Sequence, residues 1–227
     1  MKELLEESVS YFYMDLISIF CALIASIIGV IMRKKYMALR FMFLYPLASF
    51  LQTSVTYFLD FILKVDTSFS THFSIIIFLL VEFFSLYIYY YKIIKNSSFR
   101  KILITVFIIY LSLFIFKWGE NGFKLFMPAI FYFIQSIMVL SLAIIYLFFL
   151  FIDKPKSNLL NEPSFWITIG ALLYFLCTVP IYIAAKYVLG TDGFAMDKGL
   201  FSINYICYSL FFILLIRAYL CKVTAKP

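Results

Sequence analysis

The chain has 227 residues, of which 65% are hydrophobic and 14% charged, and its mean hydropathy is +1.01. A soluble domain is only about 45–50% apolar, so this composition excludes a water-soluble fold and indicates a chain solvated by lipid. The formal net charge is +7, but most of the 19 basic residues, including every arginine, fall in alternate connections between apolar segments. That distribution is an orientation signal, so we expect the lipid bilayer as a partner and no nucleic acid.

The apolar segments predict the elements of the fold. A membrane-spanning helix needs about 20 predominantly apolar residues. Seven candidate segments follow one another along the chain: 10–32, 37–64, 71–92, 101–118, 125–152, 163–188 and 199–221. The connections are short, and no Pro/Gly/Ser-rich linker divides them, so residues 1–227 are predicted to form a single transmembrane domain. The predicted fold class is all-α, a polytopic bundle of about seven transmembrane helices.

The charge of the connections predicts the orientation of the bundle. RKKYMALR, KIIKNSSFRK and DKPKSNLLNEP follow the first, third and fifth segments, and RAYLCKVTAKP ends the chain. The other connections are mixed or acidic. Because cytoplasmic connections are enriched in Lys and Arg, we expect the N-terminus outside, the C-terminus in the cytoplasm, and a multi-pass protein of the cell inner membrane. The acidic start MKELLEESVS lacks the basic region of a cleavable signal peptide, so the first helix is expected to be retained.

Motifs for metal binding and catalysis are absent from the sequence. Four cysteines, Cys21, Cys177, Cys207 and Cys221, lie in or at the end of apolar segments without a CxxC pair, which favours small core residues over a disulfide framework or zinc site. His72 is the only histidine and has no acidic partner at metal-ligand spacing. No GxSxG, HExxH or Walker loop is present. We therefore expect no metal, no cofactor and no enzymatic activity.

Glu82 is the sharpest functional candidate because it lies near the middle of the third segment, in FLLVEFFSLYIYYY. An ionisable side chain at membrane depth is costly and usually faces the interior of the bundle. A carboxylic acid that is hydrogen-bonded to a neighbouring helix is the structural interpretation. A proton relay, a cation site or a ligand contact is the functional one. The residues alone leave both open.

A second group of candidates lies toward the outer ends of the segments. Helical spacing collects Ser49, Gln52, Thr53, Thr56 and Asp60 of the second segment into a polar stripe on one face. Other segments carry polar residues at similar depth. Together they predict either an outward-opening ligand pocket or ordinary interhelical hydrogen bonds, each of which is worth about 0.6 kcal/mol. The candidates for ligand or ion binding, besides Glu82, are Gln52, Asp60, Asp15, Gln135 and Asn204.

Three stretches carry a resemblance to a known family: THFSIIIFLLVEFFSLYIYYYKIIKN, NEPSFWITIGALLYFLCTVPIYI and INYICYSLFFILLIRAYL. They resemble an uncharacterised family of small seven-helix membrane proteins from Bacteroidota. The family pattern corresponds here to Glu82, to Glu162, Pro163, Phe165 and Trp166 at the start of the sixth helix with one residue fewer, and to Asn204. Members often look like neighbours of sensor histidine kinases, so the resemblance implies a sensing or signalling partner. The usual histidine and second asparagine of the seventh helix are missing.

Two functional hypotheses follow. The first is a sensory or signalling accessory protein that binds a small or lipidic ligand in its outer half and reports to a membrane or cytoplasmic protein such as a histidine kinase. The alternative is a small proton- or cation-coupled carrier or channel that uses Glu82, and a lipid enzyme ranks third. Because the inner half is rich in Phe, Leu and Ile, we predict a blind outer pocket rather than a continuous passage. A homo-oligomer is compatible with either hypothesis.

Overall fold

The computed structural model describes residues 2–33, 38–58, 68–120, 129–153, 159–183 and 198–221. These ranges form seven α-helices and two short 3-10 helices: α1 (Lys2–Met32), η1 (Ala38–Phe41), α2 (Leu44–Tyr57), α3 (Ser68–Ile93), α4 (Ser97–Glu120), α5 (Ala129–Asp153), η3 (Leu159–Asn161), α6 (Pro163–Ile183) and α7 (Lys198–Leu220). No strand occurs in these ranges. The predicted all-α fold class is therefore confirmed.

Six of the helices, α1 and α3 to α7, contain a stretch long and apolar enough to cross a membrane. They coincide with six of the predicted segments, although α1, α3 and α4 begin several residues earlier than expected. The predicted ends at 125–128 and 184–188 lie outside the described residues. Apolar runs locate these helices well because few other structures can bury about 20 consecutive apolar residues.

The second segment, 37–64, is wrong as one continuous helix. The described part of α2 has only 14 residues, a length of about 21 Å against a hydrocarbon core of roughly 30 Å. α2 begins at Leu44, so Pro46 falls in its first turn, where the missing N–H costs no hydrogen bond. The preceding residues form η1 and a tight turn, closed by a hydrogen bond from the Met42 N–H to the Leu39 carbonyl (3.0 Å). Residues 59–64 lie outside the described residues.

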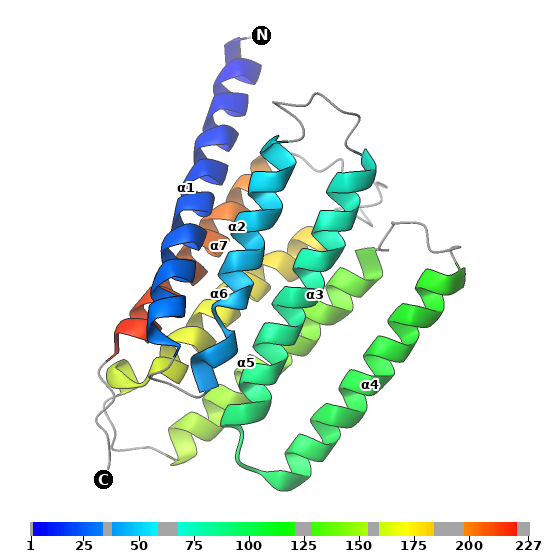
Figure 1. The fold of residues 1–227 in the computed structure, drawn as a ribbon, viewed down its shortest axis with the longest axis vertical. Coiled ribbons are helices and arrows are strands. Elements are labelled where there is room, and N and C mark those ends of the chain that lie inside the picture. Colours follow the sequence, from blue (N-terminus) through cyan, green and yellow to red (C-terminus); the bar gives the residue numbers. More distant parts are fainter. Residues whose placement is uncertain are drawn as a thin grey trace.

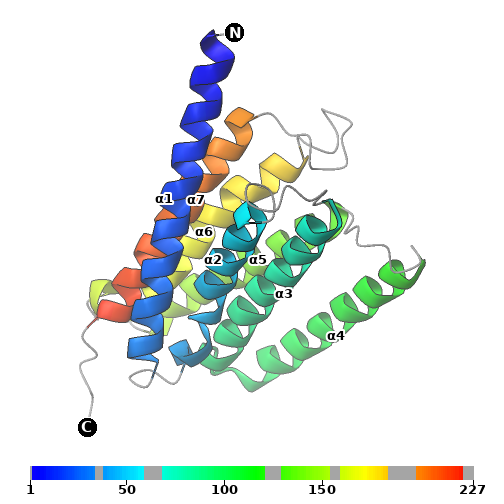
Figure 2. The ribbon, with the colours of Figure 1, turned by 45° about the horizontal axis from the view of Figure 1, so that its top comes forward.

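The helices form a bundle in which α4 stands apart (Figures 1 and 2). α7 packs against α1 and α6, α6 also packs against α5, and α2 lies between α1 and α3. α1 and α7 run parallel, so both begin at one end of the bundle and finish at the other (Figure 1). The interior of the bundle is thereby enclosed by α2, α3, α5, α6 and α7.

Aromatic side chains fill the space between α3 and α4. The Phe83 and Phe107 rings stack with centroids 5.8 Å apart, and the Tyr87 and Phe107 rings lie 4.7 Å apart. The Tyr87 hydroxyl donates a hydrogen bond to the Leu103 carbonyl. The helix α4 turns one narrow stripe inward and exposes most of its remaining apolar side chains, as expected of a helix that faces lipid on most sides.

One end of the bundle is basic. α1, α3, α5 and α7 finish there, and η1, α4, η3 and α6 begin there (Figure 1). We call it the basic end, defined by Arg33, Arg40, Lys92, Lys95, Arg100, Lys101 and Arg217 among the described residues. Two helix starts at this end follow simple capping rules: the Asn96 side chain accepts a hydrogen bond from the Phe99 N–H (3.1 Å), and Pro163 occupies the first position of α6.

Candidate functional site

Glu82 lies in the interior of the bundle, with 2% of its side chain exposed. Its Oε2 accepts a hydrogen bond from Gln135 Nε2 on α5 (3.4 Å), and the same Nε2 donates to the Leu79 carbonyl (3.1 Å). The Tyr110 hydroxyl on α4 donates to Gln135 Oε1 (3.3 Å). One amide therefore joins α3, α4 and α5, in addition to the aromatic contacts and the Tyr87 hydrogen bond between α3 and α4.

A cluster of aromatic residues surrounds the other side of the Glu82 carboxyl group. The hydroxyls of Tyr45 on α2 and Tyr174 on α6 both lie close enough to interact with it electrostatically. The Tyr45 hydroxyl and Glu82 Oε1 are nevertheless buried without a hydrogen bond of ordinary geometry. The rings of Tyr45, Tyr174 and Tyr208 pack together, with centroid separations of 6.0 Å between Tyr45 and Tyr208 and 5.1 Å between Tyr174 and Tyr208. The carboxyl group thus lies in an enclosed aromatic site, with the hydroxyls of Tyr45 and Tyr174 close to it.

The second crossing is interrupted between η1 and α2, and α2 begins near the depth of Glu82. Tyr45 is in the first turn of α2, and its ring lies 6.2 Å from the Phe78 ring, one turn before Glu82 on α3. η1, by contrast, lies beside the end of α3, because Lys92 Nζ is 4.3 Å from the centroid of the Phe41 ring. The α-helical part of this crossing therefore starts near the level of Glu82. Irregular backbone at membrane depth is tolerated where protein surrounds it or where it lines a cavity.

Large buried side chains occupy the core between Glu82 and the basic end. Leu86, Tyr89 and Tyr90 follow Glu82 on α3, and Leu215 and Tyr219 approach them from α7. All five are at most 2% exposed. Close packing of this kind leaves little room for ordered water. In the described residues the interior is therefore filled by aromatic and aliphatic side chains on the basic side of Glu82.

Asp15 forms a second buried site toward the opposite end of the bundle. The carboxylate on α1 accepts a hydrogen bond from the Tyr57 hydroxyl on α2 through Oδ2 and also interacts with Tyr205 on α7. The side chain is 5% exposed, and Oδ1 makes no hydrogen bond. A buried carboxylate oxygen without a donor is costly, so Asp15 offers an acceptor that a ligand could satisfy.

The remaining candidates are placed separately. Asn204 Oδ1 accepts a hydrogen bond from the Thr178 hydroxyl (3.1 Å), which joins α7 to α6. The Gln52 side-chain oxygen accepts a long hydrogen bond from the Thr53 hydroxyl (3.4 Å). The backbone carbonyl of Gln52 accepts a hydrogen bond from the Thr56 hydroxyl (3.0 Å). Most of the polar stripe on α2 is therefore satisfied within its own helix. Asp60 lies outside the described residues.

Three tyrosines of these sites, Tyr45, Tyr57 and Tyr110, were missed by the sequence reasoning. Tyr45 lies one helical turn before the predicted polar stripe, so extending that stripe by four residues would have found it. Tyr110 is one of the few residues with a polar group inside α4, which is itself a signal. Tyr57 had no such signal, because it pairs across helices and sits beside the stripe rather than on it.

The fold and these sites define a multi-pass helical membrane protein. No group of three or more His, Cys, Asp or Glu side chains that could hold a metal ion occurs in the part of the chain that the structure describes. Comparisons of the chain with models of known families, with curated proteins and with solved structures give no match. The buried carboxyl groups, Glu82 and Asp15, are therefore the features of this fold with the clearest chemistry.

Proposed function

We propose that the protein is a sensory or signalling accessory protein that binds a small or lipidic ligand in the half of the bundle away from the basic end. The main support for this proposal is the Asp15 site between α1, α2 and α7. One oxygen of this buried carboxylate, Oδ1, has no hydrogen-bond donor. A ligand with a cationic or hydrogen-bond-donating group would satisfy this oxygen. Because three helices meet there, binding would change how they pack against one another.

The topology belongs to the same proposal. Seven crossings, with η1 and α2 as part of the second, place the N-terminus outside and the C-terminus in the cytoplasm of the inner membrane. The clustering of arginines and lysines at the basic end supports this orientation. The ligand site would then face outward, and the basic end would meet a membrane or cytoplasmic signalling partner such as a histidine kinase, as the family resemblance implies.

A proton- or cation-coupled carrier is the second candidate, and one observation favours it. Glu82 has an oxygen without a hydrogen bond, and α2 begins beside it at the same depth. Interrupted helices often form substrate sites near the membrane midplane of transporters. A carrier also needs access from both sides, and the buried aromatic residues between Glu82 and the basic end oppose this. The sensory proposal therefore ranks first.

A thermal-stability screen tests the ligand site. The full chain is purified in detergent, and its melting temperature is measured with a panel of inorganic cations, amines, amino acids and lipids. We expect at least one compound with a donor or cationic group to stabilise the wild type and Asp15→Asn to lose that stabilisation. Glu162→Gln, the same chemical change at the basic end, is the control and should respond as the wild type does.

Proteoliposomes distinguish the two candidates. A pH-sensitive dye is trapped inside, and an inward proton gradient or membrane potential is imposed. The sensory proposal expects dye responses equal to those of empty liposomes. Proton entry that Glu82→Gln abolishes would establish the carrier and overturn the sensory proposal. A complete absence of stabilising compounds, together with no flux, would also count against a ligand site at Asp15.

A further inference from the structure

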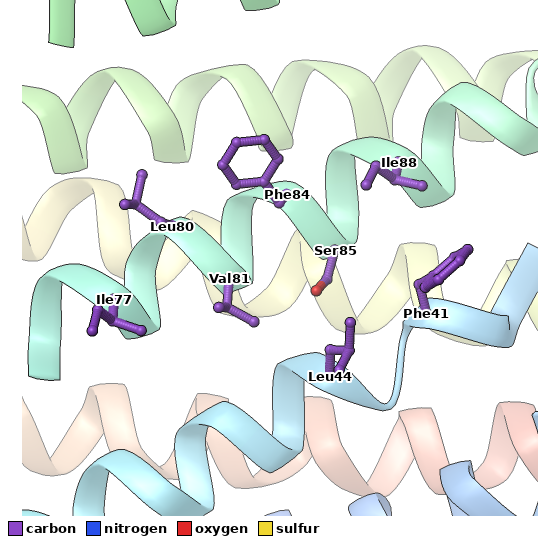
Figure 3. A pocket seen from close by; sticks show the side chains of 8 residues that line it. All are labelled: Phe41, Leu44, Ile77, Leu80, Val81, Phe84, Ser85 and Ile88. Atoms are coloured by element: carbon purple, nitrogen blue, oxygen red, sulfur yellow. The ribbon is translucent and has the colours of Figure 1, made fainter. Parts of the chain in front are cut away.

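An apolar groove runs along the lipid-facing side of α3, where η1 and the start of α2 approach it (Figure 3). Its volume is about 440 Å³, within the range of roughly 300–1,000 Å³ typical of small-molecule sites. Seven of its eight lining side chains are hydrocarbon, and Ser85 supplies the one hydroxyl. The lining residues are Phe41, Leu44, Ile77, Leu80, Val81, Phe84, Ser85 and Ile88.

The dimensions of the groove fit an extended hydrocarbon chain. Ile77, Val81 and Ile88 follow one another at spacings of four and seven residues, so they form a single stripe along α3. Eleven residues separate the first from the last, a rise of about 17 Å. Half of the hydrocarbon core of a bilayer is about 15 Å thick. The groove therefore extends through about one leaflet, from the basic end toward the middle of the bundle.

Positive charge lies at the mouth of the groove. Lys92 is one helical turn beyond Ile88, and its ammonium group is 4.3 Å from the centroid of the Phe41 ring, which itself lines the groove. Arg40, the residue before Phe41, is exposed. Arg100 is already engaged, because its guanidinium group donates to the Ile94 carbonyl (2.6 Å). Among the described residues, Lys92 lies at this mouth and Arg40 is the neighbour of Phe41 in the chain, so these two are the candidate cations to meet a ligand there.

We infer that this groove binds one anionic phospholipid of the leaflet at the basic end. An acyl chain fills the apolar groove between η1, α2 and α3, and the phosphate group pairs with Lys92 and Arg40. A lipid in the groove would contact the second crossing on both sides of its break, because Phe41 and Leu44 both line the groove. This lipid is separate from the ligand proposed at Asp15, which lies toward the other end of the bundle.

The test compares two lipids that differ only in headgroup. The full chain is delipidated in detergent, and the binding of dioleoyl phosphatidylglycerol and dioleoyl phosphatidylcholine is measured by native mass spectrometry and by melting temperature. We expect the anionic lipid to bind at least about fivefold more tightly, since one basic side chain near a membrane surface contributes about 1 kcal/mol. Lys92→Gln should remove most of this preference. Lys101→Gln removes the same charge at the same end but away from the groove, and should keep it.

A second pair of variants tests the groove itself. Ile88→Trp places a bulky ring in the groove and should abolish tight binding of either lipid, whereas Ile137→Trp on α5, at a site of similar exposure (39% against 37%), should have no effect. Equal affinity for the two lipids in the wild type would overturn the inference, as would unchanged binding in Ile88→Trp. A protein that dimerises on delipidation and dissociates only in Ile88→Trp would show instead that a second copy fills the groove.

Discussion

Gln135 on α5 and Glu82 on α3 lie side by side in the interior of the bundle, with Nε2 of the amide 3.4 Å from Oε2 of the carboxyl group. The amide also accepts a hydrogen bond from the Tyr110 hydroxyl and donates one to the Leu79 carbonyl. This one side chain therefore connects three helices. Its hydrogen bonds to neutral groups would be retained whether residue 82 were an acid or an amide.

Replacing Glu82 separates a structural role from a functional one. Glu82→Gln keeps the shape and an acceptor, so we expect a melting temperature equal to or above that of the wild type. Glu82→Leu leaves the Gln135 amide with one partner fewer and should cost about 1–3 kcal/mol. Thermal unfolding in detergent measures both. A Glu82→Gln variant that is as unstable as Glu82→Leu would show that the carboxylate charge itself holds the helices together.

The hydrogen bond between Tyr57 and Asp15 gives a second prediction. Tyr57→Phe removes the donor to Oδ2, so the buried carboxylate loses a partner and the protein should lose about 1–3 kcal/mol. Tyr91→Phe is a matched control, because Tyr91 contacts Arg100 through its ring, and the ring is retained. The double variant Asp15→Leu/Tyr57→Phe should lose less than the sum of its single variants. Strict additivity of the two losses would mean that the pair does not interact in the folded protein.

The sequence reasoning predicted helix positions better than helix partners. Long apolar runs determine where α1 and α3 to α7 cross, because the membrane admits few alternatives. The prediction of one continuous second helix was wrong near Pro46. An apolar run alone does not distinguish a proline inside a helix from one in its first turn. Membrane depth likewise predicted that Glu82 faces the interior, but Gln135 was grouped with the polar residues nearer the outer ends of the segments. The sequence could not tell that Gln135 meets Glu82, because that depends on the order of helices around the bundle.

The hydrogen-bond partners of the outer polar residues could not be predicted from the sequence. Asp15 and Asn204 were expected either to line one outer pocket or to make ordinary interhelical hydrogen bonds, and their hydrogen bonds go to different partners, Tyr57 for Asp15 and Thr178 for Asn204. The threonines of α2 bond to carbonyls four residues earlier, as Thr53 does to Ser49 (3.1 Å). A polar side chain in a membrane helix can thus be satisfied by its own backbone, and spacing does not reveal which of the two outcomes occurs.

Gly170 lies where α6 and α7 approach each other closely. A Cβ atom at this position would lie 2.5 Å from Phe211 Cδ2 and 3.2 Å from Phe211 Cε2. Phe211 is fully buried and packs against Tyr45, so its ring has little freedom to move. Gly170→Ala should therefore destabilise the protein by about 1–3 kcal/mol, although alanine is the better helix former. Thermal unfolding measures the loss, and adding Phe211→Leu should restore part of it. A stabilised Gly170→Ala variant would mean that the two helices lie farther apart.

Cys177 and Cys207 provide a direct test of how α6 packs against α7. Their Sγ atoms are 3.1 Å apart, and both side chains are half-buried free thiols. Treatment with the membrane-permeable oxidant diamide should join them: the two thiols lose two electrons and two protons, and diamide is reduced to the hydrazine. Intact mass should fall by two hydrogen atoms, and two of the four thiols should resist later maleimide labelling under denaturing conditions. Cys177→Ser should abolish the mass change, whereas Cys21→Ser should leave it intact. Persistence of the cross-link without Cys177, or full labelling of all four thiols after oxidation, would show that these two helices do not meet at this register.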